Sequence, residues 1–205
     1  MKRLLTTQHI QMKKIHFTFA LLFVSIIGAQ AQDAATETQD IAVKITANAI
    51  VDVVDDALTF DFTGNVATEA GEAFTLTGQN TQSTYLQYTL MQSNAGADDG
   101  TISVKISGLQ PGLTLKMGLT APTGLTAATN GILGSVNALF ADLANPVALT
   151  GSDAAIITGI GSCFTGEGAT EGVQIDYTME ISDYSLLDAD DGSQDNGTVT
   201  FTIAE

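Results

Sequence analysis

The residues best suited to chemistry lie in one acidic segment, residues 188–197 (DADDGSQDNG). Hard cations such as calcium bind carboxylate and backbone oxygens in loops of this composition. The EF-hand pattern fails here, because a glycine stands at the fifth position from Asp188 and a serine at the sixth. If a cation binds, we expect Asp188, Asp190 and Asp195 to supply the oxygens. The alternative is a solvated turn in which these residues only reverse the chain.

A second acidic group precedes residue 62 and consists of Asp52, Asp55, Asp56 and Asp61. Paired carboxylates can hydrolyse glycosides, but such enzymes also need a cleft that contacts the sugar. The chain has no Trp and few other aromatic residues. This group is therefore interpreted as a solvated edge, whose charge discourages pairing between sheets.

Charge and composition exclude several classes of function. The 205 residues include 7 Lys and Arg against 23 Asp and Glu, and four of the basic residues precede residue 15. After residue 31 the basic residues are Lys44, Lys105 and Lys116, the net charge is −20, and there is no Arg or His. These absences exclude Ser-His-Asp and Cys-His sites and an arginine clamp for phosphate. Nucleic acid and anionic membranes are equally poor partners. We predict that the protein is not an enzyme.

The N-terminus has the features of an export signal. An apolar run at residues 15–28 follows Lys13 and Lys14 and ends in Ala29-Gln30-Ala31, which predicts cleavage before Gln32. Translation from Met12 instead of Met1 would give a more ordinary signal. No later apolar stretch is long enough to span a bilayer. We predict a signal peptide (1–31), a flexible arm (32–39) and one domain (40–205) in the periplasm, at the cell surface or outside the cell.

Apolar and polar residues alternate with period two along most of the mature chain, as in half-buried antiparallel strands. Turn-forming pairs such as Asn130-Gly131 and Asn196-Gly197 separate several of these runs. This pattern predicts an all-β fold, an antiparallel two-sheet sandwich of the immunoglobulin-like type. The alternating runs lie near residues 41–45, 58–63, 74–77, 85–90, 102–107, 113–120, 173–181 and 198–203.

Three further features are expected within this fold. Val136, Leu139, Phe140 and Leu143 follow helical spacing, which predicts a short helix near 135–145 or, alternatively, an irregular crossover loop. Two similar series, residues 88–106 and 177–203, each predict a hairpin with an acidic turn. The lone Cys163 lies among apolar residues and is expected to be buried and reduced.

Residues 157–166 (ITGIGSCFTG), the strand 173–181 and the closing GTVTFTI at 197–203 together resemble small secreted, pilin-like β-sandwich proteins of Gram-negative bacteria. The resemblance covers the final third of the chain. It implies an adhesive or structural surface subunit in which an N-terminal arm, here residues 41–45, adds to the sheet edge of a neighbour. The chain lacks the disulfide of chaperone–usher pilins, which leaves the route of assembly open.

Three functions remain as alternatives from the sequence. The first is a structural or adhesive surface subunit, which the resemblance makes one of fimbrial type, whose partners are copies of itself or related subunits joined by strand addition. The second is a binding module for carbohydrate or calcium. The third, a hydrolase, has the least support. Residues 40–45 are either this added strand or the first strand of a self-contained domain.

Overall fold

The computed structural model describes residues 39–188, apart from 56, 63, 66, 79 and 95, and residues 196–205. The chain divides into two units, residues 1–44 and 45–205. Residues 39–44, the described part of the first unit, are exposed and form neither helix nor strand. All the regular secondary structure described below belongs to the second unit.

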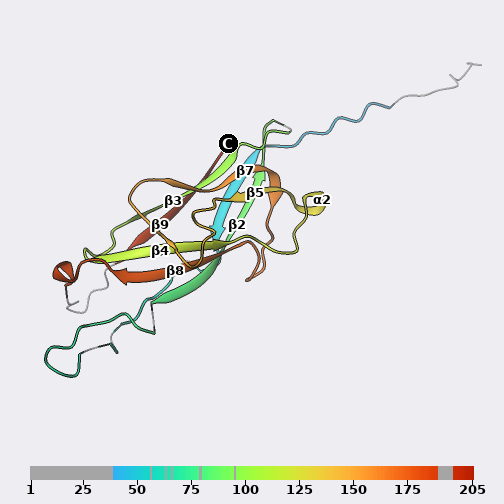
Figure 1. The fold of residues 1–205 in the computed structure, drawn as a ribbon. Helices are drawn as coiled ribbons and strands as arrows, with labels where there is room; N and C mark the ends of the chain where they lie inside the picture. Colours follow the sequence, from blue (N-terminus) through green and yellow to red (C-terminus); the bar gives the residue numbers. More distant parts are fainter. Residues whose placement is uncertain are drawn as a thin grey trace, which may run out of the picture. The chain divides into compact units, whose positions relative to one another are not determined.

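The second unit is built almost entirely from antiparallel strands (Figure 1). Helical structure in the described residues is limited to a single turn, α2, and a 3₁₀ turn, η1. The predicted all-β class is confirmed. The elements are β1 (Asn48–Val53), β2 (Thr81–Met91), β3 (Gly100–Ser107), β4 (Leu113–Thr120), α2 (Ala127–Asn130), β5 (Gly131–Val136), β6 (Val147–Ala148), β7 (Ala154–Phe164), β8 (Val173–Ile181), η1 (Tyr184–Leu186) and β9 (Thr198–Ala204).

The long strand β2 joins the two halves of the sheet. Leu86 pairs with Val53 of β1 on one edge and with Val173 of β8 on the other. Farther along that second edge, Leu90 pairs with Cys163 of β7. Hydrogen bonds therefore connect all nine strands in one sheet, in the order β6-β4-β8-β2-β7-β3-β9 with β1 and β5 attached. The two separate sheets of the predicted sandwich are not confirmed.

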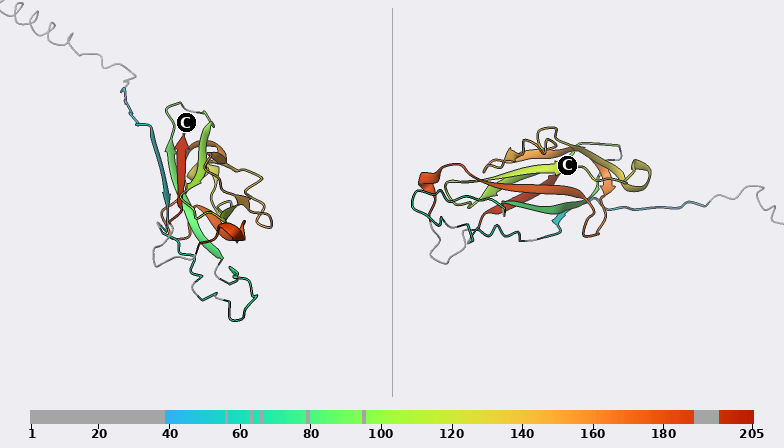
Figure 2. Two further views of the ribbon diagram at one scale, coloured as in Figure 1. Left: turned by 90° about the vertical axis from the view of Figure 1, so that its left-hand side faces the viewer. Right: turned by 60° about the horizontal axis from the view of Figure 1, so that its bottom comes forward.

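Strands distant in sequence lie side by side in this sheet. β9 pairs with β3 over seven residues, from Thr101 with Ala204 to Ser107 with Thr198 (Figure 2). β7 lies between β3 and β5. The two predicted hairpins are wrong, because β2 is not a ladder neighbour of β3, nor β8 of β9.

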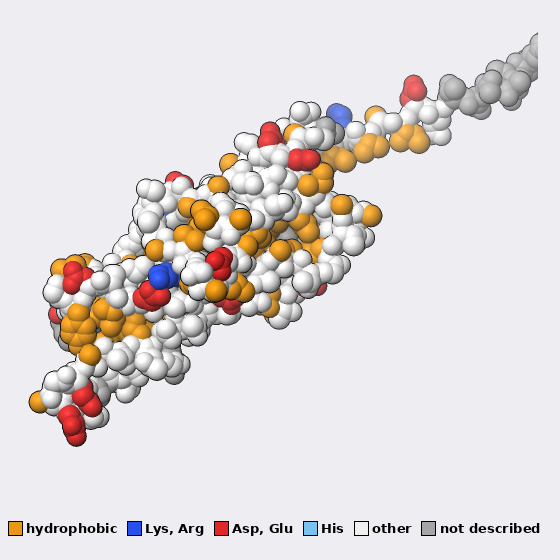
Figure 3. Space-filling model, viewed as in Figure 1, with side chains coloured by type: hydrophobic (Ala, Val, Ile, Leu, Met, Phe, Trp, Pro, Cys, Tyr) orange, Lys and Arg blue, Asp and Glu red, His pale blue; other side chains and the backbone are white. Residues whose placement is uncertain are grey.

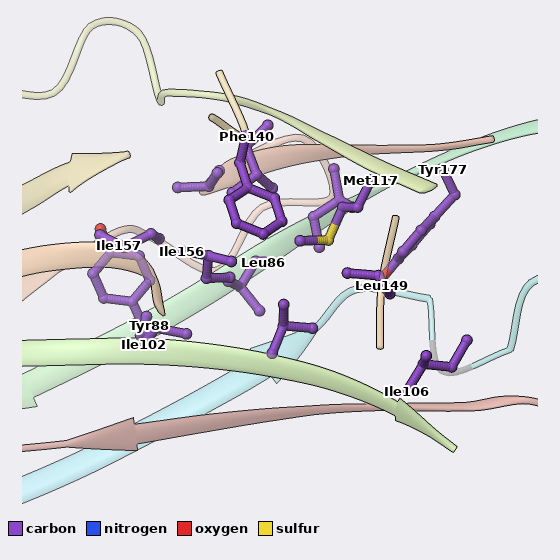
Figure 4. Close-up of a cluster of buried hydrophobic side chains, with 14 of the residues drawn as sticks. Leu86, Tyr88, Ile102, Ile106, Met117, Phe140, Leu149, Ile156, Ile157 and Tyr177 are labelled. Carbon is purple, nitrogen blue, oxygen red and sulfur yellow. The ribbon is translucent and has the colours of Figure 1, made fainter. Parts of the chain in front are cut away.

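The core is formed by the inward-facing side chains of these strands (Figure 4). On β8, Val173, Ile175, Tyr177 and Met179 are buried, and Ile181 is half-buried at the strand end. This confirms the face predicted from the alternation. The largest side chains with almost no exposed surface are Leu86, Leu90, Ile102, Met117, Leu119, Ile156, Ile157, Ile160 and Ile175.

Residues 54–80 were expected to contain two strands, and the described residues of this segment form none. The alternation still sets burial, since Leu58, Phe60, Phe62 and Phe74 pack against the core. The Phe62 ring centroid lies 6.4 Å from that of Phe60 and 6.5 Å from that of Phe74. The segment therefore packs on the core through its aromatic side chains, and it does so without forming a strand.

The predicted helix near residues 135–145 is wrong, and the alternative of an irregular crossover is correct. Val136 ends β5, and turns follow it. The amide of Asn137 donates to Ile156 O at 2.8 Å and that of Phe140 to Asn137 O at 2.9 Å. Phe140 is buried while Leu139 remains exposed, so the turn anchors one ring of the predicted apolar stripe.

Candidate functional site

The predicted calcium ligands fall in the part of the sequence between η1 and β9. Asp190 and Asp195 fall outside the described residues. Asp188 is exposed, and its backbone oxygen accepts a hydrogen bond from Gln110 Nε2 at 2.7 Å. Residues 39–188 and 196–205, with their five gaps, hold no group of three potential metal-ligating side chains. The calcium site therefore stays a prediction.

The second acidic group does not converge on a cleft in the part of the chain that is described. Asp52 is exposed on β1, and its carboxylate accepts the neighbouring Val53 amide at 2.9 Å. The amide of Asp55 donates to Thr84 Oγ1 at 3.3 Å. Asp56 lies outside the described residues. These local contacts support the interpretation as a solvated edge.

Three exposed carboxyl groups have a pKa below the ordinary range because they cap turns. The pKa of Glu72 is lowered by the amides of Thr68 and Glu69. That of Asp142 is lowered chiefly by the Asn145 side chain, and that of Asp183 chiefly by the Ser185 hydroxyl. Hydrogen bonds to the ionised form produce such shifts. Each is explained by local chain geometry and needs no acid–base chemistry.

Cys163 is buried, as the sequence predicts, and pairs with Leu90 in the ladder between β7 and β2. Burial raises the pKa of its thiol, and a hydrogen bond from the Leu90 backbone partly opposes that rise. A thiol held neutral is a poor nucleophile. A buried cysteine of this kind packs as a small hydrophobic side chain.

Two glycines of residues 158–168 lie where the chain is closely approached, one within a strand and one in the loop after it. Gly161 lies on β7, where an added Cβ would be 2.9 Å from the Asp98 carboxylate and 3.0 Å from Ile132. Gly168 donates its amide to Glu171 Oε2 at 2.9 Å. A phosphate-binding loop would need a helix after these glycines, and in the described chain β7 runs through Phe164 and is followed by β8.

The alternating segment before β1 has no partner strand in the described structure. Ile41, Val43 and Ile45 are exposed to 81%, 76% and 74%. Asn48, the first residue of β1, already pairs with Met91, the last residue of β2. Residues 41–45 form no strand in the described structure, so the alternative in which they are the first strand of a self-contained domain is not seen there.

A set of polar side chains gathers on the outer face of three neighbouring strands. Tyr85 of β2 pairs with Gln174 of β8, and Gln174 pairs with Thr120 of β4. Residues paired in this way project from the same face. Since Val173 and Ile175 on either side of Gln174 are buried, this row faces outward.

The next row orders the first through hydrogen bonds. Asp176 Oδ1 accepts Ser83 Oγ at 2.6 Å and Gln174 Nε2 at 2.9 Å. Farther along, Lys116 Nζ lies 2.6 Å from Glu180 Oε2. Figure 3 shows a basic side chain beside acidic ones over β4 and β8. Its charges are thus partly paired.

The sequence places Tyr85, Gln174 and Thr120 on the polar sides of their strands but does not bring them together. Their strands are separated by other strands in sequence, and only the sheet order makes them neighbours. The one feature of the sequence that could have pointed to this row is a tyrosine, Tyr85, on the polar side of an alternating strand.

Comparison with known proteins gives no relative from which a role can be transferred. No protein-family model, curated protein or solved structure matches the chain. Among the described residues, no helix is long and apolar enough to cross a membrane.

Proposed function

We propose that this protein is an exported structural subunit of the cell envelope or surface, in which residues 40–47 of one copy add as a strand to the sheet of another. The observation that carries the proposal is the exposed, alternating segment with Ile41, Val43 and Ile45. An extended apolar segment without a partner is suited to β-strand addition, in which backbone hydrogen bonds give affinity and alternate side chains fill pockets.

The segment could add at a sheet edge that has no ladder partner, although two strands with such an edge, β1 and β9, also contact each other. In the described residues, β1 has ladder partners only in β2, and β9 only in β3. β9 directs Val199, Phe201 and Ile203 toward the core, where they are only half-buried. A strand added beside β9 would cover these side chains further.

Composition favours this role over catalysis. The predicted mature chain has no His or Arg to serve as general base or oxyanion clamp, and its net charge of −20 keeps it soluble. Donation by one copy to the next is a head-to-tail contact, which generates open chains of subunits. We therefore expect a series of oligomers that differ by one subunit.

The test is deletion of residues 32–46 from the mature protein, with light scattering after size-exclusion chromatography at several concentrations. The deletion leaves β1 and its ladder intact. We expect a folded monomer, judged by a single cooperative melting transition that does not depend on concentration, where the longer chain forms a concentration-dependent series. Unfolding of the truncated chain, or a monomeric full-length chain, would count against strand donation.

Two double variants distinguish the loss of the apolar side chains from the effect of added negative charge. Ile41→Asp with Val43→Asp changes the apolar positions, whereas Ala42→Asp with Thr46→Asp adds equal charge at the intervening positions. Only the first pair is expected to abolish assembly. Equal loss in both would mean that charge repulsion, not side-chain insertion, controls association.

A further inference from the structure

We infer that the outer face of β2, β8 and β4 carries a binding site for one neutral sugar ring. The site is a pocket of about 270 Å³ at the end of these strands. This volume is slightly smaller than the roughly 300 to 1,000 Å³ of sites for drug-sized ligands, so it suits a single ring. The inference is independent of strand donation.

Three parts of the chain enclose the pocket. Its floor is the row of Tyr85, Gln174 and Thr120. One wall is the loop after β4, residues 121–125, and the other is the loop before β8, with Thr170 and Glu171. Gly172 fixes this second loop, because its φ of 103° and its approach to Leu86 O leave no room for a side chain.

The lining offers unused hydrogen-bonding groups. Among the described residues, the hydroxyls of Tyr85, Thr120, Thr123 and Thr170 have no hydrogen-bond partner. Each hydroxyl can both donate and accept, as sugar hydroxyls also do. A polyhydroxylated ligand therefore matches this lining better than an apolar one.

The amide of Gln174 is held in a fixed orientation. Its Nε2 donates to Asp176 Oδ1, which also accepts from Ser83 Oγ. The Gln174 Oε1 atom remains available as an acceptor. A side chain that is already ordered loses less conformational entropy on binding, which lowers the entropic cost of binding. Asp176 and Ser83 act as positioning residues, since neither lines the pocket itself.

An aromatic ring and apolar groups provide the remaining surface. Tyr85 is half-buried, and the negative face of its ring can pack against the C–H groups of a pyranose. Ala121, Pro122 and Leu125 lie on the wall formed by the loop after β4. The lining thus includes one aromatic ring, apolar groups and several polar side chains.

Charge selects against anionic ligands. Glu171 is the one charged residue in the described lining, and its Oε2 already accepts the Gly168 amide at 2.9 Å. A carboxylate or phosphate would be repelled by it. A neutral sugar can instead donate hydroxyl protons to that carboxylate.

The test is titration of the ¹⁵N-labelled mature protein with glucose, galactose, mannose and N-acetylglucosamine, followed by amide chemical shifts. Glucuronic acid and choline serve as the anionic and cationic probes. We expect at least one neutral sugar to shift amides of residues 120–125 and 170–174, and neither charged probe to do so. Shifts only with choline, shifts elsewhere, or none with any neutral sugar would overturn the inference.

Variants assign the effect to the pocket. Tyr85→Ala should weaken binding about tenfold or more, and Asp176→Asn should weaken it less. Tyr184→Ala is the matched control, because that exposed tyrosine lies on η1 and is not in the lining. Thermal melting checks that each variant is folded. A Tyr85→Ala protein that is folded and binds as tightly as the wild type would contradict the proposed platform.

Discussion

The phenol hydroxyl of Tyr88 donates a hydrogen bond of 2.6 Å to the backbone oxygen of Leu133. Tyr88 lies on β2 and Leu133 on β5, two strands that share no ladder. The Tyr88 backbone also exchanges hydrogen bonds with Thr165, whose amide donates to Tyr88 O at 3.0 Å. One buried tyrosine therefore ties β2 to both β5 and the loop after β7.

Tyr88→Phe should lower the free energy of unfolding by about 1 to 3 kcal/mol, because it removes this bond and leaves the Leu133 oxygen without its donor. Urea denaturation measures the change. Tyr85→Phe is the matched control on the same strand, since its hydroxyl has no partner in the described structure, and it should change stability by less than about 0.5 kcal/mol. Equal effects in both variants would show that the bond contributes nothing.

The protein should lose stability in alkaline solution above about pH 10. Burial raises the pKa of Tyr88 and Tyr177, and the Cys163 thiolate adds to the rise for Tyr88. The unfolded phenols ionise near pH 10, so above that pH the folded state binds more protons. The free energy of unfolding then falls with pH until the folded phenols also ionise.

Each buried phenol can contribute a slope of up to about 1.4 kcal/mol per pH unit in this range. Tyr177→Phe should remove the contribution of one phenol to the pH dependence of the free energy of unfolding. The free energy of unfolding at pH 7 should change little. Urea denaturation at several pH values between pH 8 and pH 11 measures this pH dependence in both proteins. An identical slope in the variant would show that Tyr177 ionises normally.

Ile175→Asp should cost roughly 3 kcal/mol or more, because it places an unpaired charge among core side chains. Ile175 is fully buried between β2 and β4. Thr178→Asp on the opposite face of β8 is the control, and Lys116 is its ladder partner. It should change stability by less than about 1 kcal/mol. Denaturation curves that place both variants together would contradict the face assignment.

Gly131→Ala should destabilise the protein far more than Gly124→Ala. Both glycines have positive φ, 80° and 78°, and both substitutions incur the cost of about 1 to 2 kcal/mol for that conformation. A Cβ at Gly131 would also overlap the Ser162 oxygen, whereas nothing lies within 4 Å of one at Gly124. Melting temperatures of the two variants give the comparison. A similar loss would mean that β5 moves freely to relieve the overlap.

The sequence was sufficient to identify strands whose side chains alternate between core and solvent. Residues 85–90, 113–120 and 173–181 became β2, β4 and β8 with the expected faces. A turn at Gln110-Pro111-Gly112, a sequence typical of turns, leads into β4, and the Leu113 amide donates to Gln110 O at 3.2 Å. Period-two burial is a local property, and it can be predicted from a short window.

The failures concern properties that depend on distant partners. Residues 41–45 and 58–62 alternate as well as β3 does, but no neighbouring edge pairs with them in the described structure. β7 was missed because it is flanked by other strands on both edges and carries buried side chains on both faces, so its sequence AAIITGIGSCF does not alternate. The pocket was missed for a related reason, since its floor is a row across three strands that are not consecutive in sequence.

The pairing of β3 with β9 has a consequence for how the molecule is made. Partners such as Ile102 and Ile203 are about a hundred residues apart, so loop closure is costly before any contact rewards it. A growing or translocating chain would expose the unpaired edge of β3 until β9 arrives. We therefore expect folding to be slow, and the incompletely folded chain to be vulnerable to aggregation and proteolysis. The rate of folding then matters as much to the yield of native protein as its final stability does.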